Sequence, residues 1–103
     1  MIKVTVMYPG GGSTRFDADY YFGKHLPMVK SKVGPALKKL DSELGMAGGA
    51  PGTLPTYVAM CHLYFESVDA FQGNFGPHAP EIMADIPNYT NVQPLIQISE
   101  VKS

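Results

Sequence analysis

The sequence predicts an α+β fold in which four strands and two helices follow one another in the order βαββαβ. Residues 2–8, 57–65 and 92–101 alternate in hydrophobicity with period two, as half-buried strands do, and residues 36–46 alternate more weakly. Apolar residues at helical spacing follow the strands at 2–8 and 57–65. Two βαβ units in this order fold as a ferredoxin-like antiparallel sheet with both helices on one face.

The first strand is expected at residues 2–8, where Ile2, Val4, Val6 and Tyr8 share one face. A loop at 9–15 ends this strand and contains three consecutive glycines. The chain has neither the Gly-x-x-x-x-Gly-Lys-Ser/Thr nor the Gly-x-Gly-x-x-Gly pattern of a phosphate-binding loop. The glycine run is therefore interpreted as a surface loop.

The first helix is expected to begin after Asp17, whose carboxylate suits an N-cap because it can accept an early amide hydrogen. Pro27 lacks an amide hydrogen and would interrupt a regular helix. We expect a kink or a fresh turn at this proline, after which the helix continues to about Val33.

The second strand is expected within residues 36–46, followed by a turn-rich stretch at 47–55. The strand at 57–65 has the strongest pattern, and both of its faces are largely apolar, which suits a central strand covered on each side. One face would carry Tyr57, Ala59, Cys61, Leu63 and Phe65, and the other Val58, Met60, His62 and Tyr64.

The second helix is expected to begin at the N-cap Ser67, with Val68, Phe71 and Phe75 at helical spacing. Glycine and proline at 76–77 interrupt it, and a further turn or two should continue to a stop at 86–88. The final strand is expected at 92–101.

Length and composition limit the kinds of protein that the chain can be. With 103 residues it is expected to form one domain, 1–103. A net charge of -1 and only 17% charged residues provide no basic surface for nucleic acid or for a membrane. The single cysteine, Cys61, is interpreted as a packed thiol. No signal peptide or apolar run near about 20 residues is visible, so a cytoplasmic protein is expected.

The apolar sheet face that no helix covers predicts a partner subunit. Both helices lie on one face, so the opposite face would expose Val58, Met60 and Tyr64. A sheet face this apolar is expected to meet another surface. We therefore expect a homodimer in which two such sheets face each other.

The candidate functional centre is His25. Tyr21 and His25 are four residues apart and should project from one helix face, beside Tyr20, Phe22 and Met28. A histidine among aromatic rings is partly desolvated, and its pKa can move across neutral pH. A core histidine that only binds a backbone carbonyl is the alternative interpretation.

Two segments resemble the EthD family, which is named for ethyl tert-butyl ether degradation. They are RFDADYYFGKHLP at 15–27 and FGPHAPEIMADIPNYTNVQPLIQISEV at 75–101. The resemblance runs from Ile2 to Val101 and implies a dimeric α+β barrel of ferredoxin-like protomers. The related barrels include monooxygenases, isomerases, cyclases and decarboxylases, so the resemblance implies much less about the reaction.

The hypothesis for the site combines the residues with this resemblance. His25 is the predicted general acid or base, and Tyr21 is predicted to orient the substrate or to stabilise charge. The predicted substrate-binding residues are Tyr20, Phe22, Met28, Phe71, Phe75 and Asp85. The substrate is expected to be a small apolar carbonyl, phenolic or ether-derived compound in an oxidative degradation pathway. The reaction would be either that of an EthD-like oxidoreductase or a cofactor-independent isomerisation, cyclisation or decarboxylation.

Several alternatives stay open from the sequence. Asp85 could instead end a helix and cap a local turn, and the tyrosines could be ordinary core residues. No two of His25, His62 and His78 have metal-ligand spacing, and no nucleotide loop is visible, so no metal or cofactor is expected. The alternative function is a non-catalytic dimer that binds a small molecule or assists an oxygenase system as a partner protein.

Overall fold

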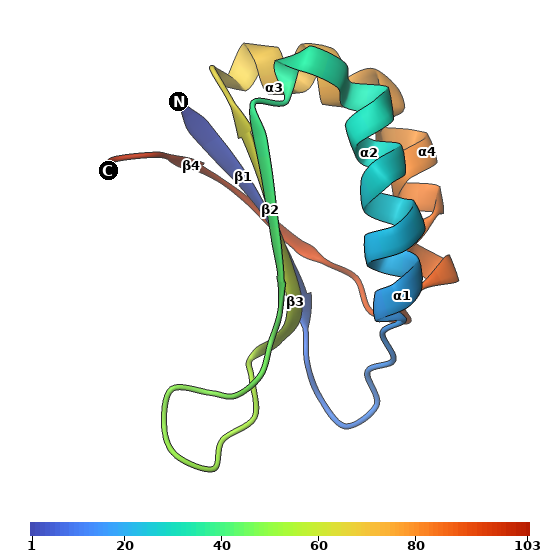
Figure 1. The fold of residues 1–103 in the computed structure, drawn as a ribbon, viewed down its shortest axis with the longest axis vertical. Helices are drawn as coiled ribbons and strands as arrows, with labels where there is room; N and C mark the ends of the chain where they lie inside the picture. The colour runs from blue at the N-terminus through green and yellow to red at the C-terminus, as the bar shows by residue number, and fades with distance from the viewer.

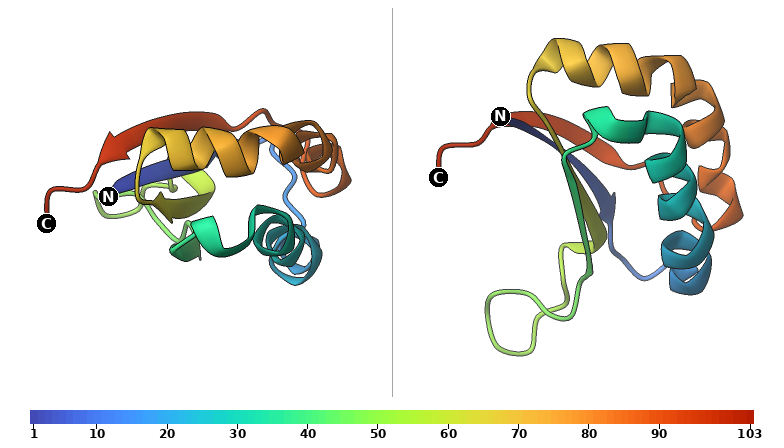
Figure 2. Two further views of the ribbon diagram at one scale, coloured as in Figure 1. Left: turned by 90° about the horizontal axis from the view of Figure 1, so that it is seen from above. Right: turned by 45° about the horizontal axis from the view of Figure 1, so that its top comes forward.

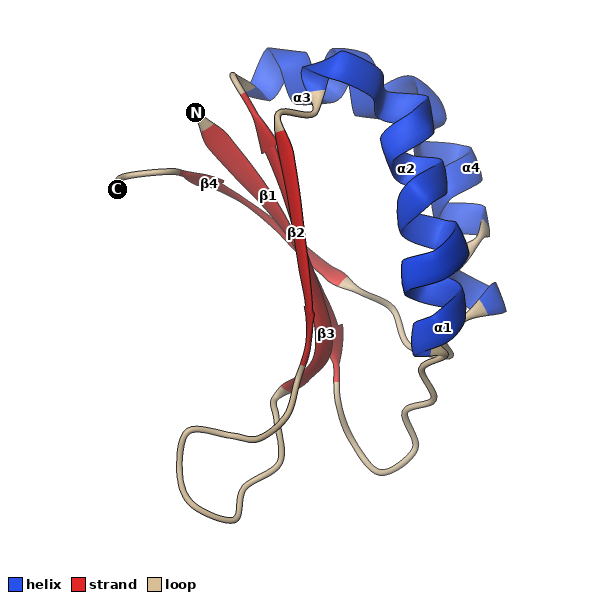
Figure 3. Cartoon of the chain, in the orientation of Figure 1, coloured by secondary structure: helices blue, strands red, loops and turns tan.

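The computed structural model describes residues 1–103 and contains one antiparallel sheet with the strand order β2-β3-β1-β4 (Figure 1). The strands are β1 (Ile2–Pro9), β2 (Lys39–Leu44), β3 (Tyr57–Phe65) and β4 (Leu95–Glu100). The helices all lie on one side of this sheet, and its other face carries none (Figures 2 and 3). The predicted α+β class and the ferredoxin-like βαββαβ order are confirmed.

The helices form two helical segments, and each segment is built from several short helices joined end to end. The first contains α1 (Ala18–Tyr20), the π-helical turn η1 (Tyr21–His25), α2 (Leu26–Val33) and the 3-10 turn η2 (Gly34–Ala36). The second contains α3 (Val68–Phe75), the 3-10 turn η3 (Gly76–His78), α4 (Ala79–Ala84) and the 3-10 turn η4 (Ile86–Asn88).

The ends of the helices follow the predicted caps, but the irregular turn lies in a different place. The carboxylate of Asp17 accepts from the Tyr20 amide, and the hydroxyl of Ser67 caps α3. The break expected at Pro27 instead precedes it: the amide of Leu26 donates to the carbonyl of Tyr21, five residues back, which widens the turn. Pro27 then occupies the first turn of α2, where its missing amide hydrogen costs little.

Two predicted strands are too long. The second begins at Lys39 and not at 36, because residues 34–36 form η2 and Gly34 has a φ of +74° that ends the helix. The fourth begins at Leu95 and not at 92, directly after Pro94, which has no amide hydrogen to donate to a strand ladder.

The core lies between the sheet and the helices. Ala59, Cys61, Leu63 and Phe65 are buried on this side of β3, as the alternation predicts. The helix-free face of β3 is half-buried within the single chain, so its apolar side chains are less exposed than expected. None of the helices has the length and apolar character needed to cross a bilayer.

Candidate active site

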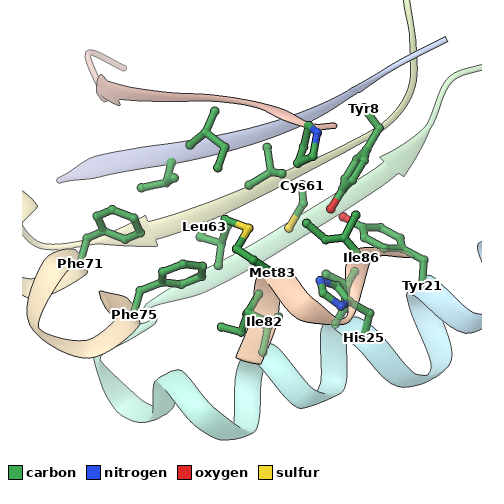
Figure 4. A pocket seen from close by; sticks show the side chains of 16 residues that line it. Tyr8, Tyr21, His25, Cys61, Leu63, Phe71, Phe75, Ile82, Met83 and Ile86 are labelled. Atoms are coloured by element: carbon green, nitrogen blue, oxygen red, sulfur yellow. The ribbon is translucent and has the colours of Figure 1, made fainter. Parts of the chain in front are cut away.

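An apolar cleft separates the helices from the sheet (Figure 4). Its cavity volume, the space open to the centre of a water molecule, is about 40 Å³, and the space between its lining atoms is about 500 Å³ when open solvent is included. Of its 16 lining residues, 14 are hydrophobic. Phe71 and Phe75 lie at one end of the cleft, and Tyr8, Tyr21 and His25 lie at the other. The cleft thus offers a long apolar wall with its polar groups gathered at one end, as small-molecule sites commonly do.

His25 ends the widened turn η1 and is almost fully buried, with 3% of its surface exposed. Its ring stacks on that of Tyr21, with centroids 5.6 Å apart and planes 16° apart. The Nδ1 atom of His25 lies 2.9 Å from Oδ2 of Asp85, which follows α4 and is 60 positions away in the chain. The two helical segments therefore meet at this contact.

Asp85 is the centre of a cluster of hydrogen bonds. Its Oδ1 atom accepts from the hydroxyl of Tyr20 at 2.6 Å and from the side-chain amide of Asn88 at 2.9 Å. Burial tends to raise the pKa of Asp85, but the hydrogen bonds from Tyr20, Asn88 and His25 outweigh burial and hold that pKa below its ordinary value. Asp85 is consequently a carboxylate at neutral pH.

Burial also sets the charge of His25. Desolvation lowers the pKa of His25, and the opposing effect of the Asp85 carboxylate offsets this only in part. At neutral pH the imidazole is therefore uncharged and can accept a proton. The carboxylate fixes the ring orientation and would stabilise the imidazolium once it forms, as in other histidine–aspartate pairs.

The other side of the imidazole faces two tyrosine hydroxyls in series. The hydroxyl of Tyr89 lies 3.3 Å from Nε2 of His25, and the hydroxyl of Tyr8 lies 2.6 Å from that of Tyr89. Both hydroxyls are buried, and burial is the main reason that the pKa of each phenol is raised, to about 12 for Tyr8. Both phenols are thus protonated at neutral pH.

Backbone contacts hold Tyr89 against the start of the first helix. The amide of Asp17 donates to the carbonyl of Tyr89 at 2.7 Å, and the hydroxyl of Thr90 donates to the carbonyl of Arg15 at 2.6 Å. Phe16 pairs with Thr90 as an isolated β-bridge. These contacts fix the segment after η4 beside η1, so that Tyr89 and His25 meet.

The structure brings only some of the predicted site residues together. His25, Tyr20 and Asp85 share one hydrogen-bond network, and Tyr21 supports the imidazole by stacking, with no hydrogen bond between its hydroxyl and His25. Phe71 and Phe75 line the far end of the cleft. The other predicted substrate-binding residues do not line the cleft: Phe22 and Met28 are half-buried against the core, and Tyr20 and Asp85 belong to the network behind His25.

Asp85 does end α4, as one interpretation of the sequence had it, but its side chain binds side chains and caps no backbone amide. Tyr8, Asn88 and Tyr89 are network members that the sequence analysis did not select. Asn88 and Tyr89 follow Asp85 at i+3 and i+4, a spacing that places all three on one face of a helical turn and could have indicated the network. Tyr8 could have been found from its face of β1, which Val4 and Val6 share.

The remaining groups of interest lie outside the network. His62 lies on the helix-free face of β3, with Nδ1 3.1 Å from the hydroxyl of Thr5 and Nε2 3.0 Å from Glu43. Burial raises the pKa of the Cys61 thiol to about 11, so this buried thiol is protonated. No group of three or more histidine, cysteine, aspartate or glutamate side chains is arranged to hold a metal ion.

This fold and site define a class of small ferredoxin-like proteins in which a buried histidine, paired with a half-buried aspartate, lies at the end of an apolar cleft. The family model described as the EthD domain matches residues 11–93. The chain therefore belongs to the EthD family. A comparison with curated proteins finds no match.

Solved structures support this assignment. An EthD-like protein from Ralstonia eutropha JMP134 is 45% identical, with a TM-score of 0.91 over 96% of this chain and 89% of that chain. An EthD family protein from Bacillus halodurans C-125 is 18% identical, with a TM-score of 0.69 over 99% of both chains. A protein from Arabidopsis thaliana is 12% identical, with a TM-score of 0.66 over 99% of this chain and 95% of that chain, and it shares the fold.

Proposed function

We propose that this EthD-family protein is an enzyme that moves a proton to or from a small, mostly apolar carbonyl, phenolic or ether-derived substrate, with His25 as the base and acid. The observation that carries the proposal is the uncharged, buried imidazole of His25, held by the Asp85 carboxylate at the polar end of an apolar cleft. Perturbed titratable groups in such a cleft are typical of catalytic sites.

The lining of the cleft supports this class of substrate. Phe71 and Phe75 can contact a flat apolar body, while the polar end presents only an imidazole and uncharged hydroxyls. There is no cationic side chain among the lining residues, which disfavours a substrate with a free carboxylate or phosphate. Cofactor-free proton transfer next to a carbonyl or phenol is the reaction that these groups can perform.

The place of this reaction in oxidative degradation, and with it an oxidoreductase role, rests on the family name. The alternative function is a binding protein that assists an oxygenase system as its partner. The apolar cleft alone would serve such a role, whereas a carboxylate that holds a buried, uncharged imidazole is an arrangement that binding does not require.

The experiment that tests the proposal uses 1-indanone, an aryl ketone, as a probe. The protein is incubated with it in D2O, and the replacement of the hydrogens beside the carbonyl by deuterium is followed by NMR. We expect the wild type to accelerate this exchange and His25→Asn to lose the acceleration while it binds the probe equally well. Equal exchange by both proteins would contradict the assignment of His25, and binding without exchange by the wild type would favour the binding protein.

We further propose that the protein is a homodimer in which two helix-free sheet faces meet as an α+β barrel. Val58, Met60 and Tyr64 lie on this face, and Leu95 beside them is 53% exposed. Met60→Asp should separate the subunits, because it places a charge in the middle of the apolar contact. Sedimentation velocity at micromolar concentration measures this. A folded wild-type monomer at that concentration would overturn the proposal.

A further inference from the structure

Both ring nitrogens of His25 are engaged in the folded protein, although the ring itself lines the cleft. Nδ1 faces the carboxylate of Asp85 and Nε2 faces the hydroxyl of Tyr89. A ligand in the cleft can therefore reach a nitrogen only by displacing Tyr89 or through the hydroxyls that are already bonded to it. The second route is complete in the structure.

The direction of each hydrogen bond follows from the charges of the groups. The Asp85 carboxylate can only accept, so the proton of the uncharged imidazole is on Nδ1. Nε2 must then accept, and the hydroxyl of Tyr89 donates its single proton to it. The oxygen of Tyr89 is left to accept from the hydroxyl of Tyr8.

Tyr8 ends this chain at the cleft. It is a lining residue, whereas Tyr89 is not. Its proton points toward Tyr89, so the lone pairs of its oxygen face the cleft and the hydroxyl of Tyr21. The hydroxyls of Tyr8 and Tyr21 point toward each other at this end of the cleft (Figure 4).

We infer that Tyr8 is the residue that exchanges a proton with the ligand, and that Tyr89 relays this proton to the His25–Asp85 pair. A C–H or O–H acid in the cleft gives its proton to the Tyr8 oxygen, Tyr8 gives its own to Tyr89, and Tyr89 gives its own to Nε2. Both tyrosines end uncharged. The ligand gains one negative charge and the imidazole one positive charge beside Asp85, and the reverse sequence returns the proton to another position of the ligand.

This inference rests on the proposed function and adds a catalytic residue, Tyr8, and a relay residue, Tyr89, to it. It also restricts the ligand to a neutral acid whose acidic proton lies at the polar end of an otherwise apolar molecule. An enolisable aryl ketone or a phenol has this form.

The test measures deuterium exchange into 1-indanone by the wild type, Tyr8→Phe, Tyr89→Phe and His25→Asn. Each variant should lose about a hundredfold or more in rate, the usual order for lost acid–base catalysis. The double variant Tyr8→Phe/Tyr89→Phe should be no slower than the slower single variant, because both changes interrupt one chain. Tyr57→Phe is the matched control: Tyr57 begins β3 and does not line the cleft, so this variant should keep the wild-type rate.

A second measurement tests the relay in the absence of ligand. In ¹⁵N-histidine-labelled protein, His25 should carry its proton on Nδ1, and Tyr8→Phe should shift the Nε2 resonance because Tyr89 connects Tyr8 to the imidazole. If the wild type leaves 1-indanone unexchanged, this spectrum decides: a proton on Nε2 overturns the relay, and a Tyr8-dependent Nε2 shift supports it.

The outcomes separate the relay from the proposed function. Wild-type exchange rates in Tyr8→Phe and Tyr89→Phe, with none in His25→Asn, would overturn the relay and leave His25 as a base that meets the ligand directly. A wild-type rate in His25→Asn would overturn the proposed function and the relay together.

Discussion

His25 and His62 lie on opposite sides of the same sheet and have nearly the same partners. Each has a carboxylate on one ring nitrogen and a hydroxyl on the other, at distances between 2.9 and 3.3 Å. The difference is exposure: the side chains of His25 and Asp85 are 4% and 18% exposed, whereas those of His62 and Glu43 are 16% and 51% exposed. Hydrogen bonds alone therefore do not distinguish the two histidines, whereas burial beside a cleft does.

The largest expected effect comes from replacing each histidine in turn. His25→Asn should fold and lose about a hundredfold or more in the rate of ketone exchange, because the amide cannot take up a proton. His62→Asn should keep the wild-type rate. Parallel circular dichroism spectra check the fold, and an unfolded His25→Asn protein would mean that His25 is a structural histidine.

Replacing the carboxylates extends the comparison. Asp85→Asn removes the charge that holds the Nδ1 proton and stabilises the imidazolium, so the exchange rate should fall more than about tenfold, but no further than in His25→Asn, through which Asp85 acts. Glu43→Gln, the matched change beside His62, should leave the rate unaltered. Equal rates for the wild type and Asp85→Asn would show that the pairing of His25 with Asp85 is structural only.

The pH dependence gives a third test. The uncharged form of His25 is the active one, and burial lowers its pKa, so exchange activity should persist below the ordinary value of about 6.5 and decline only at lower pH. A decline centred above that value would contradict the burial argument. His62→Asn should leave this profile in place.

Stability should change with pH in the same direction. Because its pKa is lower in the folded protein, His25 binds a proton more readily when unfolded, so the free energy of unfolding decreases as the pH falls below about 6.5. Asp85, whose pKa is also lowered, contributes stability above its ordinary pKa that is lost as the pH falls through the folded value. Urea unfolding between pH 8 and about pH 2 covers both titrations, and His25→Asn should flatten the upper part of the curve.

The smallest expected effect concerns Thr5, the hydroxyl partner of His62. Thr5→Val removes the hydroxyl that bonds to Nδ1 of His62 and should reduce the free energy of unfolding by about 0.5–1.5 kcal/mol. Exchange of the ketone should be unchanged. A large loss of activity in this variant would show that the helix-free face communicates with the cleft.

The fold could be predicted from the sequence because its signals are local. The alternation along β3 and the caps at Asp17 and Ser67 each depend on a few neighbouring residues. The strand ends that were misplaced lie next to Gly34 and Pro94, where backbone restrictions override side-chain alternation.

The site could be predicted only in part because its contacts are long-range. His25 was found from its aromatic neighbours, but nothing within its own helix indicates that Asp85, 60 positions later, supplies its partner. The side chain of Asp85 was equally consistent with a local turn, and Tyr8 was one apolar position among four. These contacts depend on how the two helical segments pack against β1.

The widened turn η1 has a consequence for how this segment tolerates change in length. A regular helix advances by about 100° per residue, and the wide turn holds one residue more than a regular one. Deleting Gly23, which is exposed and has no neighbouring atom within 4 Å of its Cβ position, would remove no packing contact. The deletion can therefore be taken up by closing the wide turn to a regular one, which leaves α1 and α2 in place, so that Tyr20 and His25 can both still face Asp85. Loss of one residue should thus be tolerated here, whereas loss of a second would rotate α2 against α1 by about 100° and separate the two side chains.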